Sequence, residues 1–145
     1  MKWATRPRVH VDRAACAWLI GRFIDRNPVF VFASEIADVP DDATPFDMRG
    51  AALGHHSGRC TFETMLASFD LGDDPALEEI GHIIHEADIA DAMYDAPAAE
   101  GISVLIRGLS MTSDSDHDTL TTTDKLFDGL YEHTRQQLIT GRPPA

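Results

Sequence analysis

The sequence has 145 residues, of which 43% are hydrophobic and 25% charged, and its formal net charge at pH 7 is −12. This length and composition are typical of one globular domain with one core. The charge is uneven: residues 61–145 hold 17 Asp and Glu against 4 Lys and Arg, whereas residues 1–60 are nearly balanced. An acidic surface repels a phosphate backbone, so nucleic acid is not an expected partner, whereas a metal cation is.

No run approaches the roughly 18 apolar residues of a membrane span, and Met1 leads into a polar segment rather than a secretory signal. Cys16 and Cys60 allow at most one disulfide, which a chain of this length does not need. We therefore predict a cytoplasmic protein with reduced thiols and no membrane partner. The oligomeric state is open, with a homodimer as one candidate.

The chain begins with a predicted strand and helix. Residues 2–6 are β-prone, and Pro7 limits their continuation, which suggests a strand near a sheet edge. Asp12 is a typical N-cap, and apolar residues then recur at helical spacing up to Asp25.

Two further strands are predicted before residue 50. The β-branched and aromatic run 29–33 is short enough to be a buried strand. Residues 44–47 form a third short segment that ends in the carboxylate of Asp47. The predicted order of this part is therefore β-α-β-β.

From residue 61 onward the pattern becomes helical. Helices are expected over residues 61–69, 74–91, 97–109 and 115–139, followed by a frayed tail over 141–144. Asp74 is an N-cap with Pro75 at the first helical position, and Ser115 with Asp118 resembles a capping box.

Together these elements predict an α+β fold. Residues 1–50 form a small sheet with a covering helix, and residues 61–139 form a helical subdomain. Neither part is large enough to bury a core alone, so we expect residues 1–145 to make one domain.

Histidines are the first candidates for chemistry, because neutral imidazole is a common ligand of transition metals. His82, His85 and Asp88 recur every three positions and share one helix face. That face could bind a metal or could simply be solvated, and His82 is the better candidate for a plain surface residue.

A second group of histidines lies in a loop. His55 and His56 are bracketed by Gly54 and Gly58, which permit a backbone that aims a side chain into a cleft. Glu63 follows in the first turn of the next helix, where it could be a ligand or interact with the helix dipole.

These two groups suggest one metal site made of His55, Glu63, His85 and Asp88. Nitrogen and oxygen ligands suit a divalent transition metal such as iron, manganese or zinc. The two cysteines are more typical of buried small hydrophobic residues than of ligands.

Arginines are candidates for holding a small anionic ligand such as an oxyanion. Arg13 and Arg22 could bind it through their forked guanidinium groups, or could form ion pairs with Asp47 that tie the helix to the sheet. Asp116 and His117 are weaker candidates, for a helix cap or for a residue that supports a ligand. Motifs of nucleotide-binding loops, serine hydrolases, Cys-x-x-Cys redox sites and His-Glu-x-x-His metalloproteases do not occur.

The chain resembles a known family almost from end to end. The resembling segments are Lys2-Trp3, Asp12–Asp25, Pro45–Asp47, Gly54-His55, Cys60–Glu63, His85–Ile89, Ala98–Gly101 and Asp116-His117. They are similar to the C-terminal domain of the ChrB-type chromate resistance protein, also described as a chromate resistance exported protein. The resemblance implies a link to chromate resistance, through regulation or through handling of the oxyanion. In longer regulators an N-terminal segment precedes this domain, so the resemblance gives this chain no expected DNA-binding role.

Two hypotheses about function follow. The first is a metal-binding domain in which the four predicted ligands hold the metal, and its stronger form is a small metal-dependent enzyme acting on an anionic substrate. The second is a non-enzymatic sensor of chromate or redox state that responds through Cys16 and Cys60.

Overall fold

The computed structural model describes residues 1–141, and within them the fold is α+β as predicted. The elements are β1 (Lys2–Thr5), α1 (Val11–Leu19), a π-helical turn (Ile20–Ile24), β2 (Val29–Phe32), a 3-10 turn (Ile36–Asp38), β3 (Ala43–Pro45), α2 (Thr61–Ser68), α3 (Pro75–Asp88), α4 (Ala99–Thr112) and α5 (Asp116–Thr140). Residues 142–144 of the predicted tail lie outside the described residues.

The sheet is parallel, with strand order β2-β1-β3. The prediction that residues 2–6 lie near an edge was wrong, because β1 pairs with both neighbours and Pro7 lies beyond its last ladder residue. The prediction of a buried strand at 29–33 was also wrong. β2 is an edge strand, and Val29 is 55% exposed.

The strand order places the residues that follow each strand at one edge of the sheet. The chain passes from β1 through α1 to β2 on one side of β1, and then returns to β3 on the other side. Because all three strands run the same way, Arg6 after β1, Ser34 after β2 and Asp47 after β3 lie toward the same edge. In open parallel sheets this edge is where ligands bind, at the point where the strand order reverses.

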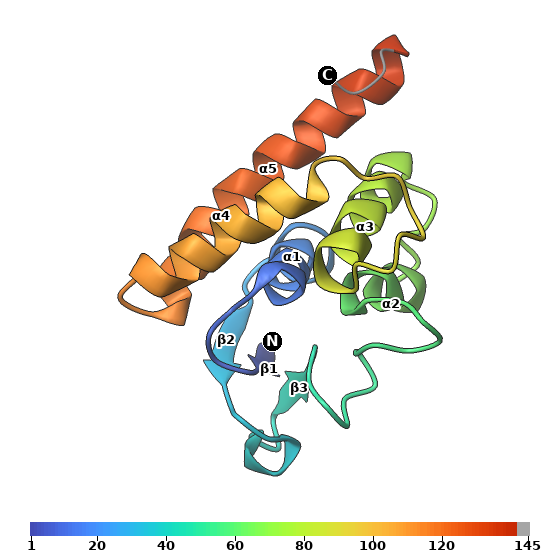
Figure 1. Cartoon of the computed structure of the whole chain (residues 1–145). Coiled ribbons are helices and arrows are strands. Elements are labelled where there is room, and N and C mark those ends of the chain that lie inside the picture. The colour runs from blue at the N-terminus through green and yellow to red at the C-terminus, as the bar shows by residue number, and fades with distance from the viewer. Residues whose placement is uncertain (142–145) are drawn as a thin grey trace.

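Helix α1 is the centre of the molecule and contacts all four other helices (Figure 1). Its buried side chains include Trp18, which packs against Phe127 and Tyr131 of α5 with ring centroids 5.8 Å apart in each case. Burying a large apolar side chain contributes roughly 1.5–3 kcal/mol, so this helix anchors the core. In Figure 1, α1 lies between the sheet and the pair α4 and α5, and the end of α5 projects beyond the other helices.

The predicted start of α1 needs correction. Its N-cap is His10, whose Nδ1 accepts a hydrogen bond from the Val11 backbone N–H, and not Asp12. Asp12 lies inside the first turn with a side chain only 2% exposed. Its carboxylate is therefore available for a different role.

The starts of α2, α3 and α5 agree with the sequence to within one residue, and the ends differ by a few residues at most. Asp74 caps α3 by accepting from the Ala76 and Leu77 backbone N–H groups, and Ser115 caps α5. α3 ends at Asp88 rather than at residue 91, and the backbone then turns through a positive φ of 54° at Ala90. α4 lies two to three residues later than predicted.

Candidate functional site

A pocket of about 580 Å³ opens at the carboxyl edge of the sheet. It combines three carboxylates, three histidines and three arginines: Asp12, Asp47 and Asp88; His10, His55 and His56; Arg6, Arg13 and Arg49. These residues come from the loops after β1 and β3, the start of α1, the 54–56 loop and the end of α3. Five separate segments thus bring opposite charges into one concave surface.

Asp12 lines this pocket and also holds the start of α2. Its Oδ2 accepts from the Thr61 backbone N–H at 2.9 Å, and its Oδ1 accepts from the Phe62 N–H at 3.0 Å. These N–H groups have no partner inside the helix, and the helix dipole favours a negative charge at this end. The Cys16 thiol also donates to Oδ1 at 3.5 Å.

Three carboxylates converge on one nitrogen of His55. Nε2 of His55 lies 3.0 Å from Asp88 Oδ2, 3.1 Å from Asp12 Oδ2 and 3.7 Å from Asp47 Oδ1. One ring N–H cannot satisfy three acceptors, so the cluster has more negative charge and more lone pairs than its own donors use. Asp12, His55 and Asp88 together could hold a metal ion.

The pKa values of the cluster reflect this crowding. Hydrogen bonding to Asp12, opposed in part by burial, raises the pKa of His55 to about 9. Burial and repulsion from Asp12 raise the pKa of Asp47 to about 6, and the same two causes raise the pKa of Asp88. Groups perturbed in this way and gathered in a pocket are typical of a functional site.

Asp47 is held in an unusual backbone conformation. Its φ is 49°, in the left-handed region that residues other than glycine seldom adopt. The Thr61 hydroxyl donates to Asp47 Oδ1 at 2.7 Å, and Arg13 Nε lies 3.3 Å from Oδ2. Backbone strain of this kind often accompanies function.

Arg13 has a buried donor facing this region. Its Nη1 donates to the carbonyls of Pro7 and Arg8, each at 3.3 Å, which fixes the guanidinium. Its Nε is buried and makes no hydrogen bond with any residue in the described part of the chain, although it pairs electrostatically with Asp47. The nearby Asp47 carboxylate offsets the cost of burying this donor by charge, and the pair fixes Arg13 beside the pocket.

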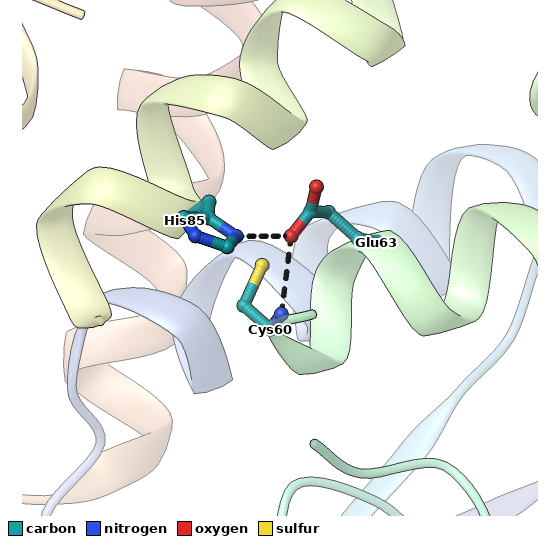
Figure 2. A group of neighbouring side chains, drawn as sticks. All are labelled: Cys60, Glu63 and His85. Carbon is teal, nitrogen blue, oxygen red and sulfur yellow. Dashed lines mark hydrogen bonds and ion pairs between the residues drawn. The ribbon is translucent and has the colours of Figure 1, made fainter. Parts of the chain in front are cut away.

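A second cluster lies between α2 and α3 (Figure 2). His85 is fully buried, and its Nδ1 pairs with Glu63 Oε1 at 2.5 Å. The same Glu63 oxygen accepts from the Cys60 backbone N–H at 3.1 Å, and this completes a capping box at the start of α2. Cys60, Glu63 and His85 could also hold a metal ion by the spacing of their atoms.

This second cluster satisfies its own donors and acceptors. Nε2 of His85 lies 2.9 and 3.0 Å from the two oxygens of Asp91, and the Tyr94 hydroxyl donates to Glu63 Oε2 at 3.2 Å. Burial by itself lowers the pKa of His85, but the hydrogen bonds to Glu63 and Asp91 outweigh it and raise the pKa. Both ring nitrogens are therefore already used within the protein.

The structure separates the four predicted metal ligands into two pairs. His55 and Asp88 meet in the pocket, whereas Glu63 and His85 meet in the second cluster, and no candidate metal group among residues 1–141 contains all four. The pocket adds Asp12 and Asp47, which the sequence did not select as ligands. The signal was present for Asp47, because it directly follows a strand of a parallel sheet.

The two predicted anion-binding arginines also lie apart. Arg13 lines the pocket and pairs with Asp47, as one of the two sequence alternatives expected. Arg22 is not among the pocket's lining residues, and it binds Asp128 of α5 through two hydrogen bonds of 2.7 Å. Asp116 accepts from the Arg8 and Val9 backbone N–H groups and so holds the loop before α1.

His82 and the two cysteines, which the sequence also raised as candidates, pack against other parts of the protein. His82 stacks on Tyr94 with ring centroids 3.9 Å apart. Cys16 and Cys60 are fully buried, and both are free thiols. Burial and the nearby Asp12 carboxylate raise the pKa of both thiols, which disfavours the reactive thiolate form.

Comparisons with known proteins agree with the resemblance found in the sequence. The family model described as "ChrB, C-terminal domain" matches residues 3–134. The chain belongs to this family. It is 39% identical over 134 residues to "Protein ChrB" of Cupriavidus metallidurans, and the match covers 91% of this chain and 40% of that relative. This is the family for which the resembling sequence segments implied a link to chromate resistance.

This ChrB-family chain spans less than half the length of its curated relative, so the relative's other regions have no counterpart in the match. No solved structure matches the chain. Among the described residues, no helix is both long enough and apolar enough to cross a membrane.

Proposed function

We propose that the pocket binds one divalent transition metal ion through His55, Asp12 and Asp88, with Asp47 as a further oxygen ligand. The observation that carries this proposal is the convergence of three carboxylates on one imidazole nitrogen, at 3.0, 3.1 and 3.7 Å. Ligand bonds of roughly 2.0–2.2 Å put neighbouring donor atoms about 3 Å apart or slightly more. The ligand atoms thus already have nearly the separation that a common ion requires.

The types of ligand atom narrow the choice of metal ion. One imidazole with two or three carboxylates is a hard, oxygen-rich set, which suits manganese or iron(II) and tolerates zinc. A soft ion such as copper(I) would prefer thiolates, but both cysteines are buried with raised pKa values. A divalent ion also offsets the charge of the three carboxylates better than the single proton of His55 does.

We further propose that the bound metal and Arg13 hold a small oxyanion, with chromate as the class that the family's association with chromate resistance suggests. Three carboxylates alone would repel an anion, so the metal has to supply the attraction. Arg13 lines this pocket with 12% of its side chain exposed, so its guanidinium is a donor that the oxyanion could use. This role makes the domain a metal-dependent oxyanion-binding module.

The cysteine-based sensor has less support. A thiol must reach the thiolate form and the solvent to react with an oxidant. Cys16 and Cys60 are fully buried, and their pKa values are raised by burial and by the Asp12 carboxylate. We therefore favour the metal site over the thiols as the place where the domain meets an oxyanion.

The test compares variants of the two clusters after loading with Mn²⁺ or Zn²⁺. We expect one ion per chain in the wild type, at least about tenfold weaker binding in His55→Ala and Asp88→Asn, and unchanged binding in the control Asp91→Asn, which alters the second cluster at its most exposed member. Metal content by mass spectrometry and titration calorimetry give the readout. Binding well below one ion per chain, or loss in Asp91→Asn alone, would contradict the proposal.

The anion step has its own measurement. Sulfate has the shape and charge of chromate but does not oxidise the protein, so it serves as the probe. We expect sulfate to bind to the metal-loaded protein and not to the metal-free protein. Equal sulfate binding with and without metal would contradict a metal-held oxyanion.

A further inference from the structure

A second pocket adjoins the first one. It has a volume of about 460 Å³ and shares Arg6, Met48, Arg49 and Gly50 with the pocket of about 580 Å³. Its remaining walls are residues 34–36, which follow β2. The two pockets therefore form one cleft along the carboxyl edge of the whole sheet, with the metal cluster at one end.

Two arginines stand where the pockets meet. Among the ion pairs and side-chain hydrogen bonds of residues 1–141, Arg13 is bound to Asp47 and Arg22 to Asp128, but none involves the side chain of Arg6 or Arg49. Both are exposed and line both pockets. This acidic chain thus presents two guanidinium groups, unpaired among the described residues, along one concave surface.

The volume of the cleft points to an organic molecule. Pockets of roughly 300–1,000 Å³ are typical of sites that enclose organic ligands, and a single tetrahedral oxyanion fills only a small part of such a space. The second pocket also has an apolar wall, formed by the side chains of Ile36 and Met48, beside the polar Ser34 and Glu35. An apolar wall gives an inorganic ion no favourable contact, whereas a carbon chain gains free energy by burying its apolar surface against it.

We propose that the cleft binds an organic anion that carries two anionic groups. One carboxylate or phosphate group lies at the metal cluster, the second lies between Arg6 and Arg49, and the carbon body packs against Ile36 and Met48. The first contact rests on the metal site proposed above, and the second does not. Arginine forks bind carboxylate and phosphate groups in pairs of parallel hydrogen bonds, which gives the second group its specificity.

The test measures binding of straight-chain dicarboxylates, from malonate to adipate, to the Mn²⁺-loaded protein at fixed ionic strength. Acetate and sulfate serve as probes with one anionic group. Variants are the double substitution Arg6→Gln/Arg49→Gln and the control Arg26→Gln/Arg59→Gln, which removes the same charge from exposed positions that do not line either pocket. Protein NMR or fluorescence reports binding, and metal content is measured in the same samples because dicarboxylates can chelate.

We expect one chain length to bind at least about tenfold more tightly than acetate, consistent with a second charge-assisted contact. Arg6→Gln/Arg49→Gln should lower the affinity for that dicarboxylate to the affinity for acetate and leave metal binding unchanged. The control pair should keep the preference for the dicarboxylate. A wild type that binds every dicarboxylate no better than acetate, or a preference that survives in Arg6→Gln/Arg49→Gln, would overturn the inference. Failure of the metal site would show differently, as loss of metal-dependent sulfate binding in the wild type.

Discussion

The two histidine clusters use the same kinds of side chain in opposite ways. His85 is fully buried, and carboxylates occupy both of its ring nitrogens, whereas the side chain of His55 is 48% exposed and one of its nitrogens faces three carboxylates. The His85 cluster has donors and acceptors in balance, so it stabilises the fold. The His55 cluster has an excess of acceptors beside a pocket, so it is suited to a ligand. Saturation of hydrogen bonds, rather than residue type, distinguishes them.

The largest expected effect is at the saturated cluster. His85→Ala removes the partner of two carboxylates in a buried site, and breaking a buried ion pair typically costs about 3–5 kcal/mol. We expect the free energy of unfolding to fall by about that amount, as measured by urea denaturation. His82→Ala is the matched control on the same helix, and its side chain is partly exposed, so it should cost less than about 1 kcal/mol. Equal losses in the two variants would contradict the contrast between the clusters.

The next effect is at Asp12, which belongs to the open cluster and also holds α2. Its two oxygens each accept from a different backbone N–H. Asp12→Asn replaces one oxygen by an amide N–H₂, which places two donors opposite each other at one of these N–H groups. We expect a loss of about 2 kcal/mol in unfolding free energy together with loss of metal binding.

Asp74→Asn is the control for that prediction. A single oxygen of Asp74 accepts from both backbone N–H groups at the start of α3, and the other oxygen accepts from the Tyr131 hydroxyl. Asparagine retains the first contact, and its amide can donate to the hydroxyl oxygen, so we expect a change below about 0.5 kcal/mol. A larger loss in Asp74→Asn than in Asp12→Asn would contradict this account.

The open cluster also predicts how stability depends on pH. The pKa of His55 is about 9 in the folded protein and about 6.5 when unfolded, so the charged imidazole stabilises the fold fully below pH 6.5. That contribution is lost as pH rises through 9. In chelator-treated protein, the difference in unfolding free energy between wild type and His55→Ala should therefore narrow from pH 6 to pH 10. A difference that widens with pH would show that His55 is not held charged by its neighbours.

The smallest effect is expected at Arg22. Its ion pair with Asp128 is about half exposed on both sides, and such pairs contribute about 0–1 kcal/mol. Arg22→Gln should therefore change the thermal midpoint only slightly and leave metal and sulfate binding unchanged. Loss of sulfate binding in this variant would restore the sequence interpretation of Arg22 as an anion ligand.

Local patterns in the sequence predicted most of the elements. The α+β class, the order of strands and helices and the caps at Asp74 and Ser115 depend on nearest neighbours, and the structure confirms them. The central position of β1 could not be predicted, because strand order is set by long-range pairing. A proline just after a strand suggests an edge, but it removes no hydrogen bond from a ladder that ends before it.

Only part of the candidate site in the pocket was predicted, again because its residues meet through long-range contacts. His55 and Asp88 were selected and do meet, but their partners Asp12 and Asp47 were read as a helix cap and a strand end. Asp12 accepts from residues 49 and 50 positions further along the chain, and no local spacing reports such a contact. Glu63 and His85 meet each other instead, because α2 and α3 pack side by side.

The proton on His55 makes occupation of the pocket an exchange rather than a simple addition. At neutral pH the imidazole holds one positive charge among the three carboxylates, and a metal ion that uses the same nitrogen must release it. The local charge then rises by one unit instead of two, and one proton enters the solvent. Calorimetric heats of metal binding at neutral pH should consequently vary with the ionisation enthalpy of the buffer, because the metal ion takes the place of the imidazole proton.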